Sequence, residues 1–325
     1  MSGDLGAEVV VRAAYASLRK YQNIELVLVG VQDELNDLVT RIVGVEPRLR
    51  IVNASEVVEM ADAPADAIRK KKDSSMRVAI DLVRSGETQA CVSAGNTGAL
   101  MGIAKFVLKM LPGIDRPAII AELPSTGGSV HMLDLGANTV CTADHLFQFA
   151  VMGSIVTADM TDIEAPRIAL LNIGAEDSKG HDTVKDAASM LSASSLNYIG
   201  FIEGSEIFSG KADVVVTDGF TGNVALKTME GTVSLMSYFL HREFAGSWYA
   251  RLAAMIARPV LRRFTQDADS RNYNGATLVG LNGIVIKSHG GADAYAFQHA
   301  IDNAIVEVRK QVPQQIGSLL QREAA

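Results

Sequence analysis

The chain has 325 residues, 48% of them hydrophobic and 21% charged, which is enough to bury a sizeable core. Thirty Lys and Arg residues against 37 Asp and Glu residues give a net charge of −7, which argues against a broad nucleic-acid-binding surface. Two cysteines make no disulfide framework and fit a reducing compartment. The sequence has no basic-then-apolar leader and no uncharged apolar run of the roughly 18 residues that span a bilayer. We therefore expect a cytoplasmic protein.

Short β-branched runs alternate with longer segments of helical periodicity along most of the chain. The runs that predict strands are 24–29, 49–52, 90–93, 118–121, 130–134, 167–172, 197–202, 213–217 and 284–287. Predicted helices between them include 75–84, 96–110, 143–158 and 183–191. Several strands are apolar on both faces, as a strand covered by helices on both sides requires. This alternation predicts a single α/β domain, residues 1–325, with a largely parallel sheet.

Residues 224–270 show no strand signal, so two or three helices are expected outside this alternation. Within them an apolar stripe at helical spacing is flanked by arginines, and Pro259 is expected to break or kink the run. The residues concerned are Trp248, Leu252, Met255, Ile256, Arg258, Arg262 and Arg263. A core helix, a helix at an anionic membrane surface and a docking site for an acidic protein would all show this pattern. The three alternatives stay open at this stage.

Small polar turns rich in glycine and asparagine follow four of the predicted strands, at 93–98, 134–138, 172–176 and 218–223. In a parallel sheet such turns share the edge where open α/β folds place their ligands. Glycine lets the backbone approach a ligand closely, and free N–H groups at helix N-termini favour an anion. The set of four turns therefore predicts a phosphate or carboxylate pocket. The alternative is that these are ordinary turn and cap residues.

Common catalytic signatures are absent from the sequence. It contains no Gly-x-Gly dinucleotide fingerprint, no P-loop, no nucleophile elbow and no metal-binding spacing, so neither cofactor nor metal is expected. Cys141 precedes a predicted helix, where a thiol can become reactive, but small buried cysteines are common and we favour that role. His289 is the better catalytic candidate, because it follows the end of a predicted strand and opens a helix.

Taken with their neighbours, these turns resemble the phosphate acyltransferase (PlsX) family of bacterial phospholipid synthesis. The motifs that carry the resemblance run in family order through the chain and include 53–60, 71–76, Ser93-Ala-Gly-Asn-Thr-Gly98, 113–117, Leu133-Asp-Leu-Gly-Ala-Asn138, 170–174, 202–204, 217–227 and 280–290. The resemblance implies a Rossmann-like three-layer α/β/α fold, similar to phosphate acetyltransferases and isocitrate-type dehydrogenases. It also implies transfer of a fatty acyl group from an acyl carrier protein thioester to inorganic phosphate, giving acyl phosphate.

Turn position and resemblance together nominate the site residues. Those expected to bind phosphate or substrate are Ser93, Gly95, Asn96, Thr97, Gly98, Asn138, Asn172, Gly174, Asp218, Gly219, Asn223 and Asn282. Those expected to neutralise phosphate or to assist thiol departure are Lys227, Lys287 and His289. Two rival functions remain: a nicotinamide-dependent hydroxyacid dehydrogenase of similar fold, and a non-catalytic phosphate-ligand sensor or scaffold.

The resemblance further implies a homodimer, and a membrane glycerol-3-phosphate acyltransferase that consumes the product. The sequence departs from the family pattern at the start of the chain. Members of the family begin with a short strand that leads into Asp-Ala-Met-Gly-Gly-Asp, whereas here only the tail of that motif is present, ending at Asp4. We expect either an upstream start codon or a lost strand, and the contribution of this first turn to the site is in question.

Overall fold

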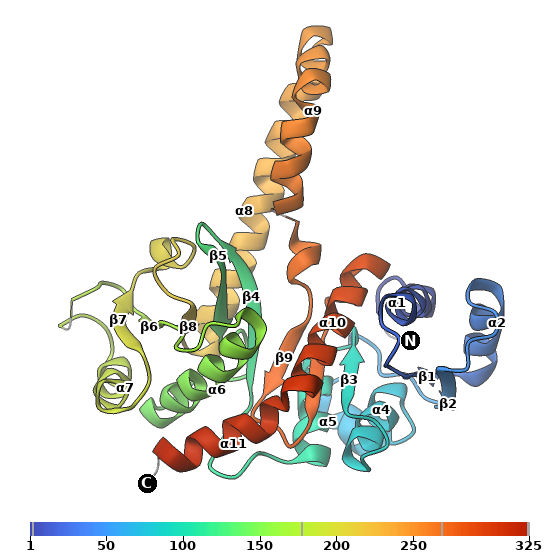
Figure 1. The fold of residues 1–325 in the computed structure, drawn as a ribbon, viewed down its shortest axis with the longest axis horizontal. Coiled ribbons are helices and arrows are strands. Elements are labelled where there is room, and N and C mark those ends of the chain that lie inside the picture. Colours follow the sequence, from blue (N-terminus) through green and yellow to red (C-terminus); the bar gives the residue numbers. More distant parts are fainter. Residues whose placement is uncertain (2, 177, 268, 324–325) are drawn as a thin grey trace.

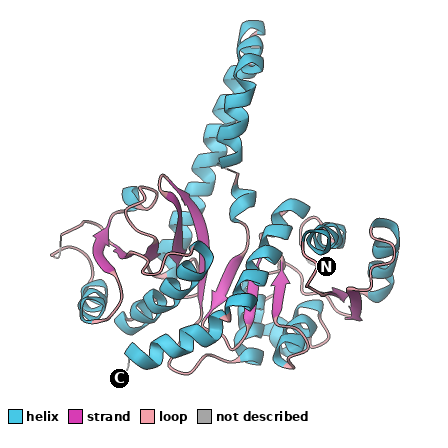
Figure 2. Ribbon diagram, in the orientation of Figure 1, coloured by secondary structure: helices cyan, strands magenta, loops and turns pink. Residues whose placement is uncertain are grey.

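The computed structural model describes residues 1–323 except residues 2, 177 and 268, and side chains are not described for 261–268 and 270. Eight strands form one mixed sheet (Figures 1 and 2). In spatial order they are β3 (Ala90–Ser93), β10 (Ile284–Lys287), β9 (Ala276–Val279), β4 (Ala118–Ser125), β5 (Gly128–Leu133), β8 (Val214–Val216), β6 (Ile168–Leu171) and β7 (Tyr198–Ile202). A separate parallel pair consists of β1 (Leu26–Gly30) and β2 (Leu49–Asn53).

Helices cover both faces of the sheet, so the expected three-layer α/β/α arrangement is confirmed. One face carries α3 (Pro64–Lys70), α4 (Ser75–Arg84), α5 (Thr97–Leu108) and the first part of α8 (Gly219–Ala245). The other face carries α6 (Ala143–Thr161), α7 (Asp182–Ala193), α10 (Ala294–Lys310) and α11 (Val312–Glu323). Two further helices, α1 (Ala7–Lys20) and α2 (Gln32–Ile42), pack with β1 and β2.

Alternate residues of single strands enter different cores, which explains why the strands are apolar on both faces. In β10, Val285 packs with the helices of the first face, whereas Ile284 and Ile286 pack against α10. In β8, Val215 packs with the helices of the first face and its neighbour Val216 with those of the other face. A strand with both faces buried needs this continuous β-branched pattern.

The directions of the strands differ from the expectation that all four polar turns share one edge. β9, which the sequence reading missed, is antiparallel to both β10 and β4, and β4 is antiparallel to β5. Consequently β5, β8, β6 and β7 run opposite to β3 and β10. The turn at 93–98 therefore lies at one edge of the sheet, while the turns at 134–138, 172–176 and 218–223 lie at the other. The expectation of a single shared edge was wrong.

A helical hairpin projects from the body of the protein (Figure 1). It is formed by α8 and α9 (Trp248–Asp267), which turn back on each other at Gly246 and Ser247. α8 begins at Gly219, before the strandless region, and α9 continues helical through Pro259 instead of breaking there. A short 3₁₀ turn, η2 (Ser270–Tyr273), leads back into β9. No helix among the described residues is long and apolar enough to cross a membrane.

The first turn of α8 lies directly against the turn that follows β5. The carboxylate of Asp134 is fully buried and accepts hydrogen bonds from the backbone of Ile119, Ala137 and Asn138 at 2.7–3.0 Å. The amide of Gly219 donates to the carbonyl of Asn138 at 2.7 Å. A Cβ atom at Gly219 would lie 2.7 Å from that carbonyl oxygen, so only glycine permits this approach.

Gly222 gives a direct test of this contact. A Cβ atom there would collide with the carbonyl oxygen of Asp134, which is backbone and cannot rotate away. We expect Gly222→Ala to lower the free energy of unfolding by about 3 kcal/mol, as overpacking of a rigid site does. Gly231→Ala, on the exposed part of the same helix, meets no atom within 4 Å and should stabilise by about 0.5–1 kcal/mol. Urea unfolding of the two variants measures the difference, and equal effects would contradict the close contact.

Candidate functional site

A cleft of 490 Å³ lies between the start of α5, the carboxyl end of β10 and α8. Apolar residues of β4 form part of its wall. The polar and charged residues that line it are Thr97, Glu122, Asn223, Lys227, Glu230, Ser234, Tyr273, Asn274, Lys287 and His289. We call it the lysine cleft. α8 starts at the far edge of the sheet and crosses its face, so it carries Asn223 and Lys227 to the edge where β3 and β10 end.

Two lysines bring positive charge into the lysine cleft. Burial lowers the pKa of Lys287 to about 8, with the charge of Lys227 acting in the same direction and that of Asp4 against it. Lys227 is half-exposed and pairs with Glu230 at 2.8 Å. A buried ammonium group that faces a second ammonium group is stabilised when an anion binds between them. The cleft is therefore electrostatically suited to a phosphate or carboxylate.

His289 is held at the mouth of the cleft by two backbone contacts. Its amide donates to Oδ1 of Asn274 at 2.9 Å, and its Nδ1 accepts from the amide of Gly291 at 3.1 Å. In the neutral ring the hydrogen then lies on Nε2, which is free to donate to a ligand. Asn274 also donates to Ser288 at 2.8 Å and to the carbonyl of Ala296 at 2.7 Å. Asn274 thus fixes the whole loop that presents His289.

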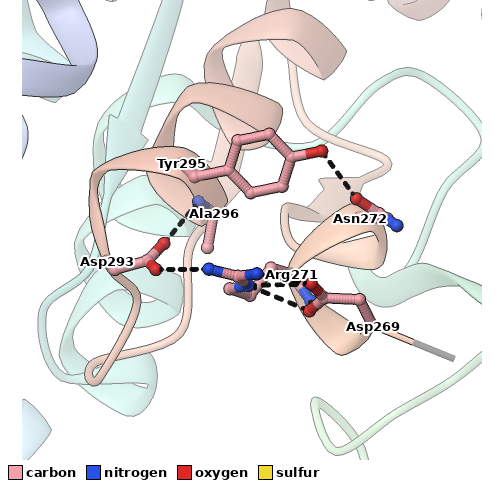
Figure 3. A network of polar contacts seen from close by, with 6 residues as sticks. All are labelled: Asp269, Arg271, Asn272, Asp293, Tyr295 and Ala296. Atoms are coloured by element: carbon pink, nitrogen blue, oxygen red, sulfur yellow. Dashed lines mark hydrogen bonds and ion pairs between the residues drawn. The ribbon is translucent and has the colours of Figure 1, made fainter. Parts of the chain in front are cut away.

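A polar network anchors the end of the hairpin beside this loop (Figure 3). Arg271 of η2 pairs with Asp269 at 2.7 Å and with Asp293 at 2.9 Å, and its guanidinium lies 5.3 Å from the centre of the Tyr295 ring. Asp293 also caps α10 by accepting from the amide of Ala296. Both ion pairs raise the pKa of Arg271. The network fixes η2 to the start of α10 and so holds Asn274 in place.

Five of the residues nominated from the sequence come together in the lysine cleft: Thr97, Asn223, Lys227, Lys287 and His289. They derive from three separated segments. The remaining nominated residues lie elsewhere.

The start of α5 uses its polar groups for structure. Asn96 caps the helix by accepting from the amide of Ala99 at 3.0 Å, and its Nδ2 donates to the carbonyls of Met60 and Asp62. Gly98 makes room for Pro64, since a Cβ atom there would lie 2.9 Å from that ring. Ser93 and Gly95 line a smaller cavity of 140 Å³ between β1 and β3.

The residues at the opposite edge divide between packing and a second cavity. Asn138 is buried and donates to Pro117 and Asp134, and Gly219 is the close-approach position described above. Asn172 and Asp218 line a largely apolar cavity of 1140 Å³ beside α8. Gly174 follows in the same loop as Asn172.

Two further candidates are placed away from the lysine cleft. Asn282 lies in the turn between β9 and β10, at the edge opposite His289, and donates to the carbonyl of Met110 at 2.7 Å. Cys141 lines the apolar cavity, where burial, assisted by the charge of Asp134, raises its thiol pKa to about 11. A thiol of that pKa is a poor nucleophile at neutral pH. Both placements follow from strand direction, which local sequence does not reveal.

Several cleft residues were missed by the sequence reading. Tyr273 and Asn274 lie just beyond the predicted helical region 224–270 and were not nominated, although Asn274-Gly275 before a β-branched run is a recognisable strand entry. Glu122 and Glu230 carried no signal. Asp4 lies beside the cleft, because its amide donates to the carbonyl of Gly290 at 2.9 Å. Among the described residues, no group of three or more His, Cys, Asp or Glu side chains is placed to hold a metal ion.

Comparison with solved structures identifies the fold. A phosphotransacetylase from Streptococcus pyogenes superposes with a TM-score of 0.62 at 22% identity, over 94% of this chain and 92% of that one. The EutD phosphotransacetylase from Staphylococcus aureus gives a TM-score of 0.59 at 17% identity, over 93% and 91%. At these identities the likeness concerns the fold alone.

Comparison of sequences identifies the family. A family model described as "Fatty acid synthesis protein" matches residues 1–315. A phosphate acyltransferase from Methylococcus capsulatus is 57% identical over 98% of this chain and 94% of its own length. Another, from Alkalilimnicola ehrlichii, is 55% identical over 99% and 94%. The chain therefore belongs to the fatty acid synthesis protein family whose curated members here are named phosphate acyltransferase.

Proposed function

We propose that the protein is an acyltransferase that moves a fatty acyl group from an acyl carrier protein thioester to inorganic phosphate in the lysine cleft. Membership of the family supports two parts of this proposal, the transfer of an acyl group and phosphate as its acceptor. The observation that supports this particular site is the convergence of Lys227 and Lys287 with the Nε2 of His289 around one cleft. The product would be an acyl phosphate for phospholipid synthesis.

The chemistry needs positioning and charge more than strong acid or base. An oxygen of phosphate forms a bond to the thioester carbonyl carbon, the carbon–sulfur bond breaks, and the sulfur leaves as a thiolate. Lys227 and Lys287 hold the phosphate, and Thr97 at the start of α5 offers donors to the developing oxyanion. The Nε2 hydrogen of neutral His289 can stabilise the departing thiolate by a hydrogen bond, and the thiolate then takes its proton from water. Holding the two reactants in register supplies much of the rate.

The rival functions differ in what the cleft should do. A nicotinamide-dependent dehydrogenase would transfer hydride, and the family relationship does not favour it. A sensor or scaffold would bind phosphate without turnover. One assay separates the three: incubation with acyl-carrier thioester and phosphate, followed by measurement of free thiol and of acyl phosphate trapped with hydroxylamine.

The hairpin supports a second proposal, contact with a membrane surface. Trp248, Met255 and Ile256 are 67–78% exposed and Leu252 is 47% exposed, so this stripe is not a buried core face. Arg258 lies on the same helix, whereas the side chains of Arg262 and Arg263 lie outside the described residues. Exposed aromatic and aliphatic residues beside arginines suit an anionic bilayer surface. Such contact would bring a cytoplasmic enzyme close to the membrane acyltransferase that uses its product.

A homodimer is part of the same proposal. Leu235, Met236, Tyr238 and Phe239 on α8 are 44–60% exposed, and exposed apolar residues gathered on one helix are typical of a protein–protein contact. Sedimentation velocity measures this directly.

Removal of the Lys227 charge should weaken phosphate binding. A lost charge-assisted hydrogen bond costs about 1.5–3 kcal/mol, so Lys227→Met should raise the KM for phosphate about tenfold to a hundredfold. Lys211→Met is the matched control, because Lys211 pairs with Glu206 on the surface outside the cleft. An unchanged phosphate KM in Lys227→Met would remove this residue from the site.

The pKa of Lys287 predicts a pH dependence. With a pKa of about 8, the free ammonium form prevails at pH 7 and is lost as the pH rises through 8. We expect kcat/KM for phosphate to fall about tenfold per pH unit above 8. Lys287→Arg keeps its charge throughout this range and should flatten the profile. A profile for Lys287→Arg that falls as in the unaltered protein would assign the titration to another group.

The hairpin stripe can be tested apart from catalysis. Trp248→Ala combined with Leu252→Glu should abolish co-sedimentation with vesicles that contain phosphatidylglycerol, while turnover of soluble acyl-carrier substrate persists. Leu5→Glu is a matched control, since Leu5 is 53% exposed and lies outside the hairpin. Vesicle binding that survives in the double variant would place the membrane contact elsewhere. Lost turnover with an intact fold would assign the stripe to the substrate instead.

A further inference from the structure

An exposed aromatic ring lies among cations on the face formed by α3, α4 and α5. Phe106 is 53% exposed. The guanidinium of Arg77 lies 5.6 Å from the centre of its ring and the ammonium of Lys109 lies 4.9 Å from it. Aromatic rings and arginine are enriched in protein interfaces, and an exposed ring beside cations can serve as an apolar anchor for a partner.

The surrounding segment is basic in an otherwise acidic chain. Residues 64–116 contain nine Lys and Arg residues and five Asp and Glu residues. The nine are Arg69, Lys70, Lys71, Lys72, Arg77, Arg84, Lys105, Lys109 and Arg116. All five acidic residues are engaged: Asp66 with Lys70, Asp73 with Ser55, Asp81 with Arg77, Glu87 with Arg50 and Asp115 with Gln148. Three of the five acidic residues, Asp66, Asp81 and Glu87, are thus neutralised by a cation of the protein itself.

Several of the cations have no such partner. Within the described part of the chain, Arg69, Lys72, Lys105 and Lys109 form no ion pair, and the ammonium of Lys109 lies over the Phe106 ring. They lie close together because α3 runs alongside α5 in the same direction. Cβ atoms built at Gly98 and Gly102 would touch Pro64 and Ile68 respectively, so the end of α3 lies near Lys105.

α5 joins this basic surface to the lysine cleft. Thr97, Met101 and Lys105 recur every four residues and so lie on one side of the helix. Thr97 lines the cleft, and Lys105 follows about 12 Å farther along the helix at 1.5 Å per residue. A partner seated over Lys105 and Phe106 would therefore have its flexible arm within reach of the cleft.

We propose that Arg69, Lys72, Arg77, Lys105, Phe106 and Lys109, together the Phe106 patch, form the docking surface for the acidic acyl carrier protein. The proposal rests on the proposed function, which supplies the carrier as a substrate. Arg69, Lys72, Lys105 and Lys109, which form no ion pair among the described residues, complement an acidic partner and accelerate its association. Phe106, with Arg77 beside its ring, gives the apolar anchor. The hairpin of α8 and α9 projects from the top of the body in Figure 1, whereas α5 lies near the bottom, so docking on α5 leaves the hairpin free to contact a membrane.

The experiment measures carrier binding separately from chemistry. Lys105→Glu combined with Lys109→Glu, and separately Phe106→Ala, are compared with the unaltered protein. Binding of the carrier protein without an acyl group is measured by surface plasmon resonance, and turnover is measured with acyl-carrier and with acyl-pantetheine of the same chain length. Arg19→Glu combined with Arg322→Glu reverses two exposed charges elsewhere and serves as the matched control. Arg251→Glu combined with Arg258→Glu tests docking on the hairpin.

We expect the charge reversal to raise the Kd for the carrier at least about tenfold at low salt, with a smaller effect at high salt. Phe106→Ala should raise it at both salt concentrations. The KM for acyl-carrier should rise in parallel, while acyl-pantetheine turnover and the melting temperature stay unchanged. Unaltered carrier affinity in both patch variants, or weakened affinity only in the hairpin pair, would overturn the proposal. Carrier binding without turnover of either thioester would reject the proposed function and leave the docking result standing.

Discussion

The close approach of α8 to the turn after β5 is the contact on which the site and the hairpin both depend. Gly219 and Gly222 let the helix backbone lie against the backbone of that turn, and the buried carboxylate of Asp134 holds the turn rigid. A buried acceptor surrounded by N–H donors tolerates little displacement. Because α8 is fixed at this end, its course across the sheet is fixed as well. The same helix then delivers Lys227 to the cleft and continues into the hairpin.

The reversal of strand direction at β9 and β4 explains why a helix must perform this task. A wholly parallel sheet gathers its ligand-binding turns at one edge. Here the turns at 93–98 and 218–223 follow strands of opposite direction, and only Thr97 of the first and Asn223 of the second line the same cleft. The cleft is built instead from one strand end, the return of the hairpin at Asn274, and the middle of α8. Arg271 ties η2 to Asp293 at the start of α10, and this contact holds Asn274 at the cleft (Figure 3).

Local pattern predicted the elements well and their relative directions poorly. The predicted helix 75–84 has the bounds of α4, and the strand 90–93 those of β3, because apolar periodicity and a cap at Ser74 are local features. β9 is as long as β3 and was missed because the Asn274-Gly275 turn before it was not recognised as the start of a strand. Strand direction depends on which strands pair, and pairing across long sequence separation leaves no local trace. The cleft lysines were found from turn position, whereas Asn274 acts through contacts that only the fold reveals.

Charge distribution ties the cleft to the surface beyond it. In a chain with net charge −7, cations that have no acidic partner mark where anions are expected to bind. Lys287 is such a cation inside the cleft, and Lys105 is another at the far end of α5. Both substrates of the proposed reaction are anionic, one small and one a protein. The basic surface lies on the same helix, α5, that leads to the basic cleft. A carrier protein bound to this surface is therefore already oriented when its thioester reaches the phosphate, and this orientation speeds the reaction.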